Sequence, residues 1–197
     1  MGYDSVVLAS ASARRSLLLA QIGVRHRSHA ADLDEERLPG EKPGDYVRRL
    51  ARDKAQAVMN ALGGSPDCPV LAADTTVVLD GRIYGKPADE AACVEILSAL
   101  SGRCHEVLTA IALQAGGRLR SALSTSRVSF RAIGVDECRR YWASGEPAGK
   151  AGAYAIQGRG AVFVATLEGS FSGVMGLPLY ETAALLDGAG VRRWQAL

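Results

Sequence analysis

The chain has 197 residues, of which 48% are hydrophobic and 22% are charged, and its formal net charge is +2. This composition is close to that of ordinary globular proteins, and it excludes a disordered, collagen-like or low-complexity chain. The small net charge also argues against binding to nucleic acid mainly through charge, so we expect no nucleic-acid partner.

The cysteines and histidines predict neither a disulfide framework nor a zinc site. Cys68, Cys93, Cys104 and Cys138 contain no CxxC pair, and the three histidines form no HExxH motif. The first residues, MGYDSVVLAS, lack a basic segment and a long apolar segment, and no apolar run reaches about 18 residues. We therefore predict a cytoplasmic protein with reduced thiols and no membrane partner.

Apolar periodicity and turn residues predict a mixture of strands and helices along the chain. We expect strands over residues 5–10, 24–31, 69–79, 82–84, 106–113, 119–130, 154–156 and 161–167, with Asp80-Gly81 as a hairpin turn. We expect helices over residues 13–22, 45–62, 89–100, 135–143 and 178–186. Because strands and helices do not alternate strictly, the pattern favours one α/β domain over residues 1–197 with a mixed sheet and flanking helices.

The lysines are few enough to be informative. Of the 23 basic residues, only Lys42, Lys54, Lys86 and Lys150 are lysines, so each is a candidate for a site that needs a compact ammonium group. The alternative is that a few lysines persist by chance. Lys54 falls on the apolar row of its predicted helix, where it must reach water or meet an anion. Lys86 and Lys150 lie in glycine-containing loops, so the pattern favours an anionic substrate.

Hydroxyl and guanidinium groups gather where the first predicted strand runs into a helix. Ser10 and Ser12 precede Arg14 and Arg15 there. A helix start offers free backbone N–H groups and a positive dipole end, and arginine forks match phosphate oxygens. The segment has neither a P-loop nor a GxGxxG motif. Taken alone, it is also compatible with an ordinary capped helix that carries surface arginines.

Two further polar residues stand out from their surroundings. Asp74 interrupts the apolar run of residues 70–79, and a carboxylate there can hold a divalent metal or accept a proton from water. The alternative role, capping a turn, is less favoured because Asp80-Gly81 already supplies the local turn. Lys86 would lie near Asp74 if the hairpin folds back. Gln157, in a stretch of small residues, offers an amide that complements a pyrimidine edge, unless it is simply solvated.

Six segments carry a more specific signal through their order and spacing: LASASARRSLLLAQIGV, LARDKA, AADTTVVLDGRIYGKP, LSGRCHEVLTAIAL, KAGAYAIQGRGAVFV and EGSFSGVMGLPLYE. Together, from about residue 8 to residue 186, they resemble the Maf family of nucleoside triphosphate pyrophosphatases. The resemblance implies an inosine-triphosphatase-like (Maf/Ham1) α/β fold, with a long mixed sheet and two lobes around a central cleft. It also implies hydrolysis of a nucleoside triphosphate between its α and β phosphates, with a divalent metal cation as cofactor.

The resemblance also assigns roles to individual residues. Asp74 matches the proton acceptor of the family, and Arg14, Thr75 and Gln157 match positions linked to substrate choice. Asp74-Thr75 together with Gln157 resembles the subgroup that acts on dTTP and UTP, rather than the one that acts on 7-methyl-GTP. The phosphate-side positions are Ser10, Arg15, Lys54 and Lys86. The metal-holding positions are Asp74 and Glu35.

Some alternatives stay open at this point. Ala13 stands where the family usually has proline, which suits the first turn of a helix, so the phosphate loop is expected to be looser. Ala11 and Thr76 also depart from the commonest pattern. Asp74 could activate water or only hold the metal. A nucleotide-binding regulator of septum formation and a generic metal-dependent phosphatase are the competing functions, and the resemblance is compatible with a homodimer.

Overall fold

A computed structural model describes residues 2–64 and 68–195, and a seven-stranded sheet forms its centre. The strands are β1 (Ser5–Leu8), β2 (Arg25–Ser28), β3 (Val70–Leu79), β4 (Arg82–Tyr84), β5 (Cys104–Ala115), β6 (Arg118–Phe130) and β7 (Val164–Glu168). Their order is β2-β1-β3-β5-β6-β7, with β4 beside β3. Strand β1 runs parallel to β2 and β3, and the other pairs are antiparallel. The predicted mixed sheet is confirmed.

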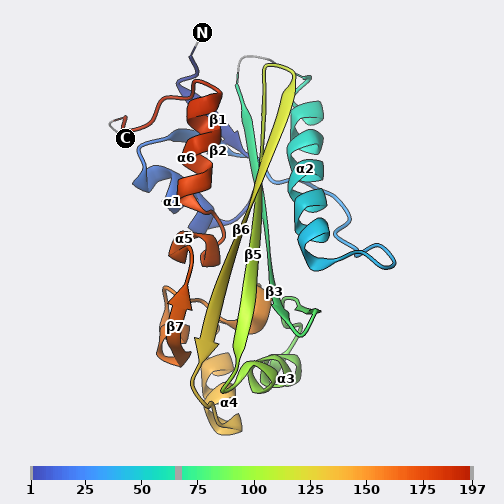
Figure 1. Cartoon of the computed structure of the whole chain (residues 1–197), viewed down its shortest axis with the longest axis vertical. Coiled ribbons are helices and arrows are strands. Elements are labelled where there is room, and N and C mark those ends of the chain that lie inside the picture. The colour runs from blue at the N-terminus through green and yellow to red at the C-terminus, as the bar shows by residue number, and fades with distance from the viewer. Residues whose placement is uncertain (1, 65–67, 196–197) are drawn as a thin grey trace.

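Helices cover this sheet on both faces. They are α1 (Ala13–Gln21), α2 (Pro43–Ala61), α3 (Glu90–Leu100), α4 (Val135–Ala143), α5 (Phe171–Val174) and α6 (Leu179–Gly188), with short 3-10 turns η1 (Ala151–Ala153) and η2 (Arg159–Phe163). The long strands β3, β5 and β6 run along the molecule, with α2 on one side, α1 and α6 on the other, and α3 and α4 at the far end (Figure 1). The expected flanking helices and two lobes are therefore present.

Three apolar clusters form the core of the two lobes. One packs α2 against the sheet, a second packs α1 and α6 against the opposite face, and the third fills the far lobe around Phe130, Tyr141 and Phe163. Strand β3 serves both of the first two, since Val70 and Ala72 join the α2 cluster, whereas Leu71 and Ala73 join the other. Because side chains alternate along a strand, the next two residues of β3 also face opposite sides.

The predicted hairpin after β3 is confirmed. Asp80 and Gly81 both have positive φ, at 50° and 76°, between the paired residues Leu79 and Arg82. Positive φ at both central positions is the requirement of a type I′ turn, which matches the twist of the two strands. The turn brings the loop after β4, with Lys86, back toward the middle of β3.

The strand predicted over residues 154–156 is wrong. Tyr154 is extended, with φ of -146° and ψ of 160°, but residues 154–156 pair with no described strand of the sheet. They lie between the tight bend at Gly152 and Ala153, whose φ values are 70° and 58°, and a turn that begins at Ile156. Gly152 is required there, since a Cβ atom would lie 2.6 Å from the side chain of Val77. The strand predicted over residues 161–167 is only partly right, because residues 159–163 form η2 and β7 begins at Val164.

One short helix was not predicted. The four residues of α5 follow Ser170, whose hydroxyl accepts a hydrogen bond from the backbone N–H of Gly173 at 2.9 Å and caps the helix. The segment is too short for apolar periodicity to reveal it. All four cysteines carry free thiols, as expected. Within residues 2–64 and 68–195, the helices are too short or too polar to cross a membrane.

Candidate active site

A cavity of about 810 Å³ opens beside the middle of β3. Strand β1 pairs with β3 only as far as Leu71, and β4 pairs with it only from Val77, so within the described chain no strand borders residues 72–76 on that side. Chain segments from both lobes surround this gap. Every site residue predicted from the sequence lines the cavity: Ser10, Arg14, Arg15, Glu35, Lys54, Asp74, Thr75, Lys86 and Gln157.

The junction of β1 and α1 forms one wall of the cavity. Helix α1 has no acidic residue in its first turn, and the hydroxyl of its N-cap residue Ser12 makes no capping hydrogen bond. The hydroxyl of Ser10 accepts hydrogen bonds from the Ser12 N–H at 3.2 Å and from Arg15 Nη1 at 3.1 Å. The first-turn N–H groups of α1 and both arginines therefore lie at the cavity wall, in an arrangement that suits an anion.

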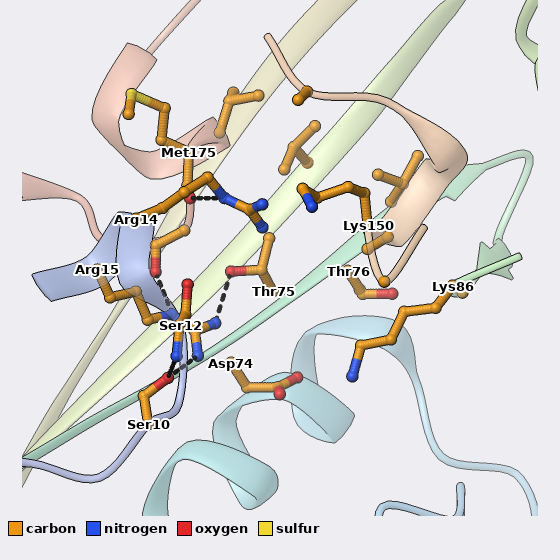
Figure 2. A pocket seen from close by; sticks show the side chains of 18 of the residues that line it. Ser10, Ser12, Arg14, Arg15, Asp74, Thr75, Thr76, Lys86, Lys150 and Met175 are labelled. Carbon is orange, nitrogen blue, oxygen red and sulfur yellow. Dashed lines mark hydrogen bonds between the residues drawn. The ribbon is translucent and has the colours of Figure 1, made fainter. Parts of the chain in front are cut away.

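Arg14 and Arg15 are held by backbone carbonyls that follow α5. Arg15 Nε donates to Gly176 O at 2.8 Å, and Arg14 Nε donates to Met175 O at 3.4 Å (Figure 2). Burial lowers the pKa of both guanidiniums, and for Arg15 the charge of Asp74 opposes this effect. Arginine stays protonated at any physiological pH, so two fixed positive charges face the cavity.

Lys54 joins the two acidic residues of the site. It lies on α2, is 8% exposed, and places its Nζ 2.7 Å from Asp74 Oδ1 and 2.6 Å from Glu35 Oε1. The apolar row of α2 thus ends on a buried ion pair, which is the second of the two outcomes predicted for Lys54. Tyr46, also on α2, donates from its hydroxyl to the backbone carbonyl of Glu35 at 2.9 Å and anchors that loop. Lys86 Nζ lies 3.9 Å from Glu35 Oε2.

The pKa values of the two carboxylates are shifted in opposite directions. Asp74 is 7% exposed, and its burial raises its pKa although Lys54 and Arg15 oppose the shift. Burial would also raise the pKa of Glu35, but the hydrogen bond and the charge of Lys54 outweigh it, so the pKa is lowered. The site therefore contains one carboxylate with a raised pKa next to one with a lowered pKa. Such divergent neighbours are typical of catalytic sites.

The segment between η1 and η2 forms the far wall of the cavity. Gln157 is exposed at its rim, and among the described residues nothing pairs with its amide. Tyr154 lies behind it, with its hydroxyl 3.0 Å from Nε2 of the buried His105. This wall presents the unpaired amide of Gln157 to a ligand, whereas the opposite wall presents Arg14 and Arg15.

The profile of the family described as Maf-like protein matches residues 5–189. The chain belongs to the Maf family. It is 55% identical over 190 residues to the "dTTP/UTP pyrophosphatase" of Bordetella parapertussis, which covers 93% of this chain and 92% of the relative. It is 53% identical over 198 residues to the protein of the same name from Nitrosomonas europaea, which covers 95% and 96%. The family resemblance found in the sequence is thus confirmed.

The Maf family implies a divalent cation, and the donor atoms fit one. Asp74 and Glu35 both bond to the same ammonium group, so their carboxylates converge on one point of the cavity. Mg²⁺ is usually bound by one or two carboxylates together with phosphate oxygens and water. The described residues contain no cluster of three or more acidic, histidine or cysteine side chains that could hold a metal by themselves. The site is therefore suited to a cation that arrives with a phosphate ligand.

The cavity also contains residues that the family resemblance did not assign to the site. Lys150 lines the cavity across from Arg14, and Met175 and Gly176 supply the carbonyls that hold the arginines (Figure 2). The scarcity of lysines already pointed to Lys150. The contacts of the two carbonyls with the arginines could not be predicted from the sequence, since every residue type has a backbone carbonyl.

Proposed function

We propose that this Maf protein hydrolyses dTTP and UTP between the α and β phosphates and releases the nucleoside monophosphate and pyrophosphate. The observation that carries the proposal is the buried Asp74, set among Lys54, Arg15 and Glu35 in a cavity large enough for a nucleotide. The names of the relatives support the same substrates.

The phosphates occupy the cationic wall. The N–H groups of α1 and the guanidinium of Arg15 bind phosphate oxygens. Lys54, from α2, and Lys86, from the loop after β4, add positive charge. Arg15 and Lys54 are held by their protein partners before substrate arrives, so they stabilise the charge that develops on the departing pyrophosphate with little rearrangement.

Asp74 is the residue that we place next to the attacking water. Its raised pKa suits a group that accepts a proton as water attacks the α phosphorus. Glu35, which stays ionised, and Asp74 would hold the divalent cation. When bound, such a cation neutralises phosphate charge and lowers the pKa of a coordinated water. Lys54 keeps both carboxylates in position.

The wall that carries Gln157 recognises the base of the nucleotide. The amide of Gln157 can accept a hydrogen bond from the N3–H of uracil or thymine and donate one to a neighbouring carbonyl. Cytosine lacks the N3–H, so one partner is left unmatched, at about 1–3 kcal/mol. A purine must also fit a larger ring system into the same space.

The test is a nucleotide panel with product analysis. We expect pyrophosphate from dTTP and UTP, and higher kcat/KM for these two than for CTP, ATP or GTP, with Mg²⁺ or Mn²⁺ present. Asp74→Asn should lower turnover at least about 100-fold and still fold. Asp53→Asn is the matched control, because Asp53 lies exposed on α2 and, among the described residues, forms an ion pair only with Arg49. Release of orthophosphate alone, a preference for GTP, or near-normal turnover in Asp74→Asn would each contradict the proposal.

A further inference from the structure

Two threonines face each other across β3 and β5 beneath the cavity. Thr75 and Thr109 are paired in register, and their Oγ1 atoms are 3.0 Å apart. Thr75 lines the cavity, whereas Thr109 is 1% exposed and does not line it. Thr109 therefore acts on a ligand only through its neighbours.

The direction of the hydrogen bond between them is determined by a third group. Thr109 Oγ1 lies 2.8 Å from the backbone carbonyl oxygen of Gly173, and a carbonyl can only accept. The single proton of Thr109 is thus committed to Gly173 O. Thr75 must then donate its own proton to Thr109. Its lone pairs are left for other donors, and Arg15 Nη2 occupies one of them at 3.3 Å.

These bonds close into a ring through the turn that follows α5. Gly173 O also accepts the Gly176 N–H at 2.9 Å, and Gly176 O accepts from Arg15 Nε at 2.8 Å. Arg15 returns to Thr75 through Nη2. Gly176 has a φ of +112°, a backbone conformation that side chains rarely adopt, and a Cβ there would approach Arg15 Nε to 3.4 Å. The ring joins the sheet, α5 and the start of α1.

We propose that Thr109 is a positioning residue, which closes this ring and thereby fixes the guanidinium of Arg15 and the orientation of the Thr75 hydroxyl for the substrate. The inference rests on the proposed function, since it assigns Arg15 to phosphate. It has a chemical consequence for Thr75. With its proton turned inward, Thr75 offers the cavity an acceptor for a substrate N–H or O–H, and it donates nothing to a phosphate oxygen.

The test replaces Thr109 by residues that keep its shape. Thr109→Val removes the hydroxyl, and Thr109→Ser keeps it. Thr182→Val is the matched control, because Thr182 is also fully buried and its Oγ1 has no partner among the described residues. We measure KM and kcat for UTP, and the Kd of inorganic pyrophosphate by calorimetry, well below the melting temperature.

We expect Thr109→Val to raise KM and the pyrophosphate Kd about tenfold, with kcat changed less, because one positioned hydrogen bond is worth about that factor. Thr109→Ser should stay within about twofold of wild type, and Thr182→Val should match wild type. If Thr109→Val does not fold, Thr109→Cys is judged by the same criteria, since a thiol is a weak donor.

Two results overturn the inference. One is a Thr109→Val protein with wild-type KM and pyrophosphate affinity, and the other is a Thr109→Ser protein impaired as strongly as Thr109→Val. Failure of the proposed function is a separate result, in which wild-type protein binds pyrophosphate but cleaves neither dTTP nor UTP. The calorimetric comparison of the variants still tests the ring in that case.

Discussion

Lys54 Nζ lies 2.7 Å from Asp74 Oδ1, although the two residues come from α2 and β3 and both are more than nine-tenths buried. The pair occupies the point where the apolar contact between α2 and the sheet ends at the cavity. Removing one partner of a buried pair leaves an uncompensated charge, which is more costly than the pair itself. The contact is therefore expected to matter for both stability and activity.

Lys54→Met should abolish most activity and destabilise the protein. Methionine fits the apolar row of α2, but Asp74 loses its closest positive charge, so we expect a loss of about 3 kcal/mol at neutral pH. The loss should shrink as the pH falls, because Asp74 has a raised pKa and becomes neutral. Denaturant unfolding at several pH values measures this. An unchanged stability at neutral pH would mean that the pair contributes nothing to the fold.

Lys150→Met should weaken substrate binding without harming the fold. Burial and the charge of Arg14 lower the pKa of Lys150, so the two cations repel each other until an anion arrives. We expect KM for UTP to rise about tenfold, kcat to change little, and the melting temperature to hold or rise. Lys42→Met is the control, because Lys42 is exposed at the start of α2, and its side chain makes no capping hydrogen bond. Equal kinetics in both variants would remove Lys150 from the site.

Gln157→Glu should reduce the discrimination among bases. The change removes the amide donor and adds a negative charge at the wall opposite the cations, so kcat/KM for dTTP and UTP should fall more than that for CTP. Gln56→Glu, on the exposed face of α2, serves as the control for the added charge. The readout is the ratio of kcat/KM values for UTP and CTP in each protein. A ratio unchanged from wild type would show that Gln157 does not contact the base.

His105 should make the protein less stable below neutral pH. Burial lowers its pKa to about 4 from an ordinary value of 6.5, so between these values the unfolded chain binds a proton that the folded chain does not. Stability due to this histidine is fully present above pH 6.5 and is lost as the pH falls through about 4, by an amount on the order of 3 kcal/mol.

His105→Gln tests this, because glutamine keeps a hydrogen-bonding partner for the Tyr154 hydroxyl but does not titrate. The free energy of unfolding is measured from pH 7.5 to pH 4.5 in both proteins. We expect the wild-type curve to fall more steeply over this window than that of the variant. Parallel curves would show that His105 becomes protonated in the folded state.

Much of the architecture could be read from local patterns. The helices α1 to α4 and α6 and the long strands follow from apolar periodicity, and the hairpin at Asp80-Gly81 follows from residues that tolerate positive φ. The family pattern singled out nine residues, and all nine line the cavity. Their individual roles remain predictions for the experiments above.

Other features depended on the tertiary structure. Residues 151–163 are rich in small and apolar side chains, so their sequence favours strands, but Gly152 packs against Val77 and turns the chain. Asp74 and Thr75 are neighbours in sequence, yet strand alternation sends one toward α2 and the other toward α1, where they meet Lys54 and Arg15. The sequence by itself determined the family and most of the helices and strands. The ion pair and the threonine ring were decided by the packing of distant segments. Apart from the local bond between Gly176 and Gly173, their partners are 20 to 161 residues apart and include backbone carbonyls.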